Sequence, residues 1–314
     1  MNPRISRRQL VAAVAAAAAL PWAARAQSAW PGKPVNMIVP FPAGGGTDAF
    51  ARPLATQFSK LTGKALVIDN RGGAGGTLGA SVAAKLPPDG HNLFMGGAHH
   101  MVAPSMYPRL DYDIEKDFLP LIQVASVPQV LVVNAKRANT GSYQEFIDLI
   151  RKNPGKLNYA SAGAGSVHHL AGELFKQQTK TFITHIPYRG AGPALQDLIA
   201  GNVDMNFDGL GSSAGHIKGG RIKALMVAGN KRNAAIPDVP CAAELGLPSY
   251  NVHTWYGIWA PKGTPADAQN AAIEAIRKAS KGPVAKPAWS GRGPTSPAFP
   301  GHKSPKLSHT GTAR

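Results

Sequence analysis

Residues 40–52 read PFPAGGGTDAFAR, which places three glycines and a Thr-Asp pair between an apolar run and a helical segment. Glycine lets a backbone approach a ligand closely, and the first N–H groups of a helix have no partner within the helix. The positive end of the helix dipole lies at the same point. The stretch therefore predicts an anion site, for a phosphate, a carboxylate or the oxyanion of a reaction.

The first part of the chain alternates strands and helices. Apolar runs predict strands at 35–41, 65–70 and 91–97, and the segments between them predict helices at 47–63 and 75–90. This order is typical of a parallel sheet covered by helices.

A second unit of the same kind begins with an expected strand at 127–135. A helix at 142–155 follows, with Ser142 as its N-cap and Glu145 three residues later. Further strands are expected at 157–163, 182–188, 202–209 and 221–229, and further helices at 166–180 and 191–201. A last strand at 250–265 and helix at 265–280 would return to the first unit, so the sequence predicts an α/β fold with two lobes and a hinge.

Three glycine-rich turns, at 43–48, 70–80 and 161–170, lie between a strand and a helix. In open α/β sheets such turns lie where ligands bind. The second turn imitates a dinucleotide fingerprint, but it is on the second strand–helix turn of its unit and lacks the usual ribose-binding acid. We therefore expect no cofactor.

The amino terminus has the three parts of a secretory signal peptide. A positive start at 4–8 precedes an apolar segment at 10–20 and a small-x-small cleavage site at 24–26. The apolar segment is too short to cross a hydrocarbon core of about 30 Å as a helix. We expect residues 1–26 to be a signal peptide cleaved after Ala26 and the mature protein to be exported, by the Sec or, given Arg7-Arg8, the twin-arginine route.

The net charge of +17 does not indicate a nucleic-acid partner, because much of it lies at the two ends. Four of the 34 basic residues fall in the first 26 residues and six follow Ser280, and neither stretch contains an acid. The middle has 24 basic residues against all 17 acids, and no aromatic residues interleave with basic runs.

The single cysteine, Cys241, excludes an internal disulfide.

Two motifs suggest other chemistry. Residues 211–215, GSSAG, match the nucleophile elbow of serine hydrolases, so an exported hydrolase using Ser213 is an alternative function, although only His302 and His309 follow the last acid, Glu274. The pairs His99-His100 and His168-His169 resemble metal ligands, but adjacent helical residues point apart. We expect no metal site and favour turn or hydrogen-bonding roles for these histidines.

Seven separated segments, including IDNRGGAGGTLGASVAAKLPPDG, YASAGAGSVHHLAGELFK and IPYRGAGPALQDLIAGNVDMNFDGL, resemble in order and spacing the Bug-type substrate-binding proteins of tripartite tricarboxylate transporters. The resemblance covers about residues 30–279. It implies a two-lobed periplasmic-binding-protein type II-like fold, each lobe a mixed sheet flanked by helices. It also implies a non-enzymatic protein, expected to be a monomer, that delivers a small carboxylate (tricarboxylate-, dicarboxylate- or aromatic-acid-like) to a membrane permease or a sensor.

The resemblance also implies boundaries and a site. Residues 30–125 plus 252–280 would form the first lobe and residues 126–251 the second. The first and third glycine-rich turns would hold the carboxylate, with nearby residues lining the cleft: Ala43, Gly44, Gly45, Gly46, Thr47, Asp48, Ser161, Gly163, Gly165, Ser166, His169, Tyr188, Arg189, Gly190 and Asp208. Asp48 is expected to cap its helix or orient water.

Residues 281–314 are rich in proline, contain no acid and show no apolar periodicity. The resemblance would place further helices here, so we expect an aberrant tail, produced by a frameshift, or a disordered basic tail. The frameshift interpretation predicts that the shifted reading frame near codon 280 encodes an amphipathic helix.

Overall fold

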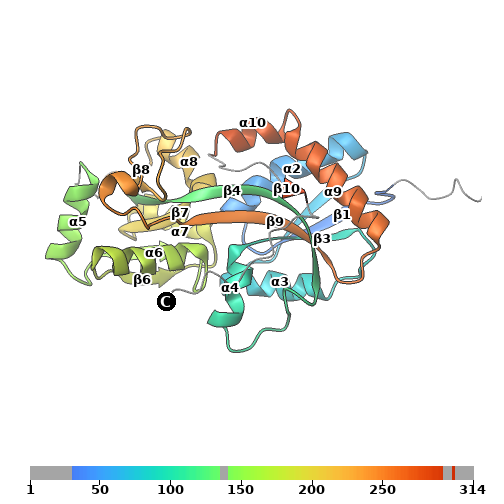
Figure 1. Ribbon diagram of the computed structural model, residues 1–314, viewed down its shortest axis with the longest axis horizontal. Coiled ribbons are helices and arrows are strands. Elements are labelled where there is room, and N and C mark those ends of the chain that lie inside the picture. Colours follow the sequence, from blue (N-terminus) through green and yellow to red (C-terminus); the bar gives the residue numbers. More distant parts are fainter. Residues whose placement is uncertain (1–29, 135–140, 293–298, 301–314) are drawn as a thin grey trace, which may run out of the picture.

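The computed structural model describes residues 30–134, 141–292 and 299–300 (Figure 1). The predicted signal peptide at 1–26 lies outside these residues. Within them, the strands form one curved sheet of order β2-β1-β3-β9-β4-β7-β5-β6, with β8 and β10 also paired to β4. The strand bounds are β1 Val35–Val39, β2 Leu66–Asn70, β3 Asn92–Gly97, β4 Phe118–Asn134, β5 Asn158–Ser161, β6 Thr184–Pro187, β7 Met205–Gly209, β8 Ile222–Val227, β9 His253–Pro261 and β10 Phe299–Pro300.

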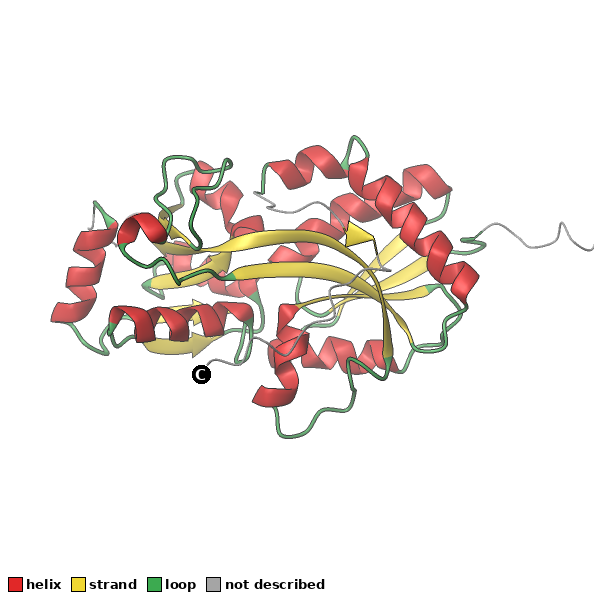
Figure 2. Ribbon diagram, viewed as in Figure 1, coloured by secondary structure: helices red, strands yellow, loops and turns green. Residues whose placement is uncertain are grey.

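Strand β4 belongs to both halves of this sheet. Its residues 118–128 pair antiparallel with β9, and its residues 129–134 pair antiparallel with β7 and β8. Around it, β1 runs parallel to β2 and β3 in lobe 1, and β5 runs parallel to β6 and β7 in lobe 2. Each lobe is therefore a mixed sheet, and Figure 2 shows the two long strands β4 and β9 running from one lobe into the other. The predicted two-lobed fold is confirmed.

Helices cover both faces of each lobe. Their bounds are α2 Gly46–Thr62, α3 Thr77–Ala84, α4 Ala98–Met106, α5 Tyr143–Lys152, α6 Val167–Thr179, α7 Ala191–Ala200, α8 Leu210–Lys218, α9 Ala266–Lys281 and α10 Ala285–Ser290, with 3-10 turns η1 Ala74–Gly76 and η2 Ala243–Leu245. Two predicted signals are confirmed: Gly63 ends α2 in the left-handed conformation (φ 68°), and the Ser142 hydroxyl accepts a hydrogen bond from the Glu145 N–H at 3.2 Å.

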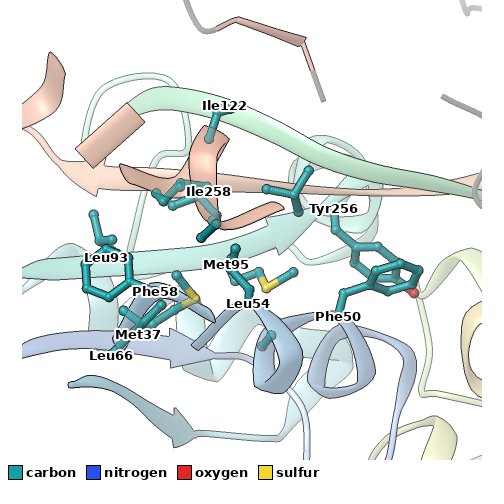
Figure 3. Packing of buried hydrophobic residues seen from close by; sticks show 14 of the residues in the cluster. Met37, Phe50, Leu54, Phe58, Leu66, Leu93, Met95, Ile122, Tyr256 and Ile258 are labelled. Carbon is teal, nitrogen blue, oxygen red and sulfur yellow. The ribbon is translucent and has the colours of Figure 1, made fainter. Parts of the chain in front are cut away.

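The core of lobe 1 lies between the sheet and helices α2, α9 and α10. Figure 3 shows Phe50, Leu54 and Phe58 of α2 facing Met37 and Met95 of the sheet, and all five are fully buried. Burial of each such side chain contributes about 1.5–3 kcal/mol. On the other face, α3 packs on a smaller cluster around β1 and β3.

Lobe 2 has a core on each face of its sheet. On one face α5 and α6 pack Phe146 and Phe175 against Leu131 and Phe207. On the other face α7 and α8 pack on the opposite side of β4, where Leu198 is fully buried. Because side chains alternate along β4, its consecutive residues from 130 to 133 enter the two cores in turn.

The start of the predicted tail is helical, which a disordered segment would not be, and the frameshift interpretation stays a prediction. Residues 285–290 form α10, and Trp289 is only 6% exposed, within the core of lobe 1. Its indole ring lies 5.6 Å from the ring of Phe50 and donates a hydrogen bond to the Phe50 carbonyl at 3.2 Å. Two apolar residues one turn apart, Ala285 and Trp289, are enough to bury one face of this short helix, although the segment has no longer periodicity. Residues 293–298 and 301–314 lie outside the described part.

Candidate functional site

A small cavity of about 30 Å³ lies where the two lobes meet. Its lining comes from lobe 1, from lobe 2 and from β9: Phe41, Gly45, Gly46, Thr47, His99, Ala162, Ser166, Val167, His168, Ala191, Thr254 and Tyr256. At its edge the lobes touch, since the Tyr107 hydroxyl donates to the Ala164 carbonyl at 2.8 Å. Gly75 packs so closely on the same carbonyl that a Cβ there would lie 2.5 Å from the oxygen. The lobes are thus closed around the cavity.

The amino-terminal ends of four helices meet at this cavity, two from each lobe. The lining includes the first turns of α2 and α4 in lobe 1 and of α6 and α7 in lobe 2. No side chain caps α2 or α7, because their N-cap residues are Gly45 and Gly190. Each helix start offers N–H groups without intrahelical partners and a partial positive charge. Together these helix ends make a site for an anion.

No basic side chain contributes to this site. The described residues that line the cavity include no lysine, arginine, aspartate or glutamate. Positive potential at the cavity therefore comes from backbone groups, and histidine is the side chain in the lining that can become cationic.

Only part of the predicted turn at 43–48 lines the cavity. Gly45, Gly46 and Thr47 line the cavity, whereas Ala43 and Gly44 are exposed at its outer side. The Asp48 carboxylate points away from the cavity: it accepts hydrogen bonds from the Gly44 N–H at 3.0 Å, from Arg52 at 2.8 Å and from the Asn70 amide at 3.2 Å. These contacts agree with a role of Asp48 in fixing the turn.

In the predicted turn at 161–170, Ser166 lines the cavity as the N-cap of α6. The other predicted residues hold the turn in shape. The Ser161 hydroxyl bonds to His185 Nε2 at 2.6 Å and accepts from the Gly163 N–H at 3.0 Å. His169 stacks on the ring of His185 and accepts from the N–H of Gly165, and both glycines have a positive φ (Gly163 121°, Gly165 74°).

The remaining predicted residues lie around the cavity but do not line it. The Tyr188 hydroxyl donates to Asp197 at 2.6 Å, Arg189 is exposed, and Gly190 begins α7. Asp208 is fully buried on β7, and burial raises the pKa of its carboxyl to about 7. Its oxygens lie 2.6 Å from Ser212 Oγ and 3.5 Å from His168 Nδ1.

Several lining residues were not predicted. Phe41, Ala162, Val167 and Ala191 are small or apolar neighbours of the predicted turns, whereas Thr254 and Tyr256 come from β9, far away in sequence. For His99 and His168, turn or hydrogen-bonding roles were favoured over a metal-ligand role, and a place in the lining was not predicted. Each is the first histidine of its pair, and the expectation that adjacent histidines point apart is wrong for one pair: the rings of His99 and His100 lie 3.9 Å apart. The described residues contain no group of three or more potential metal ligands.

The structure does not support a nucleophile elbow at GSSAG. Ser213 is fully buried in the first turn of α8, where its hydroxyl donates to the Gly209 carbonyl at 3.2 Å. A hydrolase would need this hydroxyl exposed next to a histidine.

No helix among the described residues has the length and apolar character needed to cross a membrane.

Comparison with known proteins agrees with this geometry. The profile of the family described as "Tripartite tricarboxylate transporter family receptor" matches residues 50–290. A protein from Pseudomonas sp. (strain P51), named for the tcbD-tcbE intergenic region, is 40% identical over 89% of this chain and 83% of its own length.

Two solved structures are similar over most of this chain. The periplasmic binding protein BugD is 33% identical, with a TM-score of 0.81 over 84% of this chain and 88% of that one. A protein of R. palustris, solved with adipate, is 33% identical, with a TM-score of 0.83 over 87% of this chain and 92% of that one.

Proposed function

Because this chain belongs to the tripartite tricarboxylate transporter receptor family, we propose that it is a periplasmic binding protein that captures a small carboxylate between its lobes. The observation that carries the proposal is the meeting of four helix amino termini at one interlobe cavity that no basic side chain lines. Backbone N–H groups and one or two hydroxyls suit a planar anion with a single charge. A relative was solved with adipate, a dicarboxylate, and each of its two carboxylate groups is a planar group of this kind.

The proposed site combines direct and supporting residues. The backbone of Gly45 and Gly46 and the hydroxyls of Thr47 and Ser166 contact the proximal carboxylate, since these groups line the cavity from both lobes. The other predicted residues shape the two turns or support them from behind, as their hydrogen bonds indicate, and Arg189 remains on the surface.

We propose that lobe 1 comprises residues 30–125 and 252–280 together with α10, and that lobe 2 comprises residues 126–251. The distribution of the hydrophobic clusters supports these boundaries to within a few residues, because the main cluster of lobe 1 extends to Val127, two residues past the first boundary, and resumes at Tyr256. Strands β4 and β9 then act as the hinge, and an anion between the lobes draws them together.

We further propose that the mature protein acts in the periplasm as a monomer, after removal of residues 1–26, and presents its ligand to a membrane permease or a sensor. The family description and the periplasmic relatives support this assignment. A catalytic role has no support at Ser213, which is buried and bonded to the main chain.

A thermal-shift screen of the mature protein tests the function. Mono-, di- and tricarboxylates are compared with nucleotides and with phosphate. A true ligand at 100 times its dissociation constant should stabilise the protein by about 2.7 kcal/mol. Stabilisation by a nucleotide but by no carboxylate would refute the proposal, and cleavage of test esters that is lost in Ser213→Ala would establish the hydrolase instead.

Replacing Ser166 by alanine should reduce carboxylate affinity by about 0.5–1.5 kcal/mol, or roughly two- to tenfold, because one hydroxyl donor to the ligand is lost. The same change removes the N-cap of α6, where Ser166 accepts from the His169 N–H at 3.3 Å, so stability should also fall by about 1 kcal/mol.

Ser142→Ala is the matched control. Ser142 caps α5 with the same hydrogen bond, and α5 contributes nothing to the cavity. This variant should lose similar stability without any change in affinity. Equal carboxylate affinity of the two variants, measured by titration calorimetry, would show that the Ser166 hydroxyl does not contact the ligand.

A further inference from the structure

Three hydroxyl groups in the cavity lining have no hydrogen-bond partner among the described residues. They belong to Thr47 of α2 and to Thr254 and Tyr256 of β9, which are 3%, 7% and 5% exposed. The fourth hydroxyl in the lining, that of Ser166, accepts from the His169 N–H. Buried polar groups in proteins are normally hydrogen-bonded, so three exceptions at one cavity indicate that a bound molecule completes their bonding.

The two hydroxyls of β9 face the cavity together. Thr254 and Tyr256 are two residues apart on one strand, so their side chains leave the same face of the sheet, and Trp255 between them packs on the opposite face. Protein atoms enclose the unpartnered hydroxyl of another buried tyrosine, Tyr112, completely. Those of Thr254 and Tyr256 are not enclosed in this way, and both residues line the cavity.

The Tyr256 hydroxyl is held next to the proposed carboxylate site. Its ring packs on Phe50 in the core of lobe 1, with ring centroids 5.1 Å apart (Figure 3). A Cβ at Gly46 would overlap the Tyr256 hydroxyl oxygen, so this oxygen lies directly against the first residue of α2. A group attached beside a carboxylate at this helix end would therefore meet the hydroxyls of β9.

The charges around Tyr256 favour a neutral group at this place. Burial, followed by the effect of Asp208, raises the pKa of the Tyr256 hydroxyl, and Arg292 opposes them with a smaller effect, so the hydroxyl stays protonated. The described lining contains no lysine or arginine. A second carboxylate beside β9 would thus be a buried anion without a cation, which is strongly unfavourable. A ligand hydroxyl carries no charge and can both donate and accept.

The size of the cavity restricts the carbon skeleton. Its volume of about 30 Å³ has room for roughly two or three water molecules. The apolar part of the lining, which includes Phe41, Ala162 and Ala191, adjoins the helix ends and suits a short hydrocarbon segment. An acid of about two or three carbon atoms is therefore the size that the closed lobes can enclose.

We propose that the ligand is a short 2-hydroxy monocarboxylate, such as glycolate or lactate, whose hydroxyl group binds the hydroxyls of Thr254 and Tyr256. The inference rests on the proposed function, since it places the carboxylate at the helix ends with Thr47 and Ser166. A plain acid of the same length would leave the hydroxyls of β9 buried without a partner. This difference is the kind that lets a site reject an analogue that lacks one hydroxyl group.

Titration calorimetry on the mature protein with matched acids tests the ligand class. Glycolate is compared with acetate, lactate with propionate, and both hydroxy acids with the diacids succinate and adipate. We expect each hydroxy acid to bind about tenfold or more tightly than the plain acid of the same length. The diacids should bind more weakly than either hydroxy acid, because their second carboxylate finds no cation.

Variants assign the preference to β9. Tyr256→Phe and Thr254→Val each remove one hydroxyl and should weaken glycolate binding about tenfold, with acetate affinity changed by less than about twofold. Tyr112→Phe is the matched control, since it removes an unpartnered hydroxyl from a buried tyrosine outside the cavity lining, and it should leave both affinities unchanged. Urea unfolding of each variant checks that the fold is retained.

Each contrary result is distinct. Equal affinity for glycolate and acetate would show that water, and not a ligand hydroxyl, completes the hydroxyls of β9. Tighter binding of succinate or adipate than of the hydroxy acids, or equal losses for glycolate and acetate in the β9 variants, would also overturn this inference. All three results leave the proposed function standing. Failure of the wild-type protein to bind any carboxylate would refute the proposed function itself, and the inference with it.

Discussion

Replacing Gly45 by valine is expected to weaken carboxylate binding about a hundredfold, equivalent to roughly 2.7 kcal/mol, while the stability of the protein hardly changes. Gly45 has an extended backbone (φ −82°), which valine adopts without strain. A Cβ at this position would lie 3.7 Å from the Cβ of Ala191 and 3.8 Å from the N–H nitrogen of Gly192, both in lobe 2. The two methyl groups of valine extend beyond that point, so they would fill the space between α2 and α7.

The expected loss of affinity arises because the two lobes can no longer close on the anion. A bulky side chain at Gly45 separates the two pairs of helix ends, and an anion can then contact one lobe at a time. Gly45→Ala is the matched control, because its Cβ makes an ordinary van der Waals contact, and we expect less than about a fivefold loss. Calorimetry measures both affinities and urea unfolding measures both stabilities. If Gly45→Val binds carboxylates as the wild type does, the ligand does not lie between these helices.

Replacing Trp289 by alanine is expected to lower the free energy of unfolding by about 3–5 kcal/mol, as is typical for a large aromatic side chain in a core. Trp289 packs on Phe50 of α2 and donates a hydrogen bond to its carbonyl, so the substitution leaves a cavity and removes this hydrogen bond. Urea unfolding measures the change.

An exposed aromatic residue provides the control. Phe182 in lobe 2 is 60% exposed, and Phe182→Ala should change stability by about 0.5 kcal/mol or less. Equal stability of the Trp289 and Phe182 variants would show that α10 does not hold lobe 1 together. The sequence from residue 281 onward would then be an appendage, as its composition suggested.

Local signals in the sequence were sufficient for most of the fold. The Ser142 cap, the glycine at position 63 and the alternating apolar runs depend on residues close together in the chain, and each predicted its element. The first half of β4 was not predicted, because Pro120 interrupts a run that pairs with β9 across two irregularities in register. Helix α8 was also missed, since glycine and serine at 211–213 are weak helix formers.

The sequence indicated the turns whose backbone lines the candidate site, but it did not indicate the side chains that other elements contribute. Gly45, Gly46, Thr47 and Ser166 were identified because a glycine-rich turn before a helix is itself the signal for an anion site. Tyr256 had no such signal, since it reaches the cavity from a strand some 200 residues after the first turn. Asp208 was expected to line the cleft, but β7 places it behind the lining, where it acts on His168.

The position of β9 determines the order in which the newly made chain can fold. In the sheet, β9 lies between β3 and β4, so the part of the protein that emerges first stays incomplete until residues 253–261 have been synthesised. Helices α9 and α10, which cover its core, come later still. The residues of lobe 2 are consecutive in the sequence, so lobe 2 can fold while lobe 1 still lacks β9. Lobe 1 is therefore the first lobe to be synthesised and the last to fold. A chaperone that protects its incomplete sheet from aggregation must bind throughout synthesis and export.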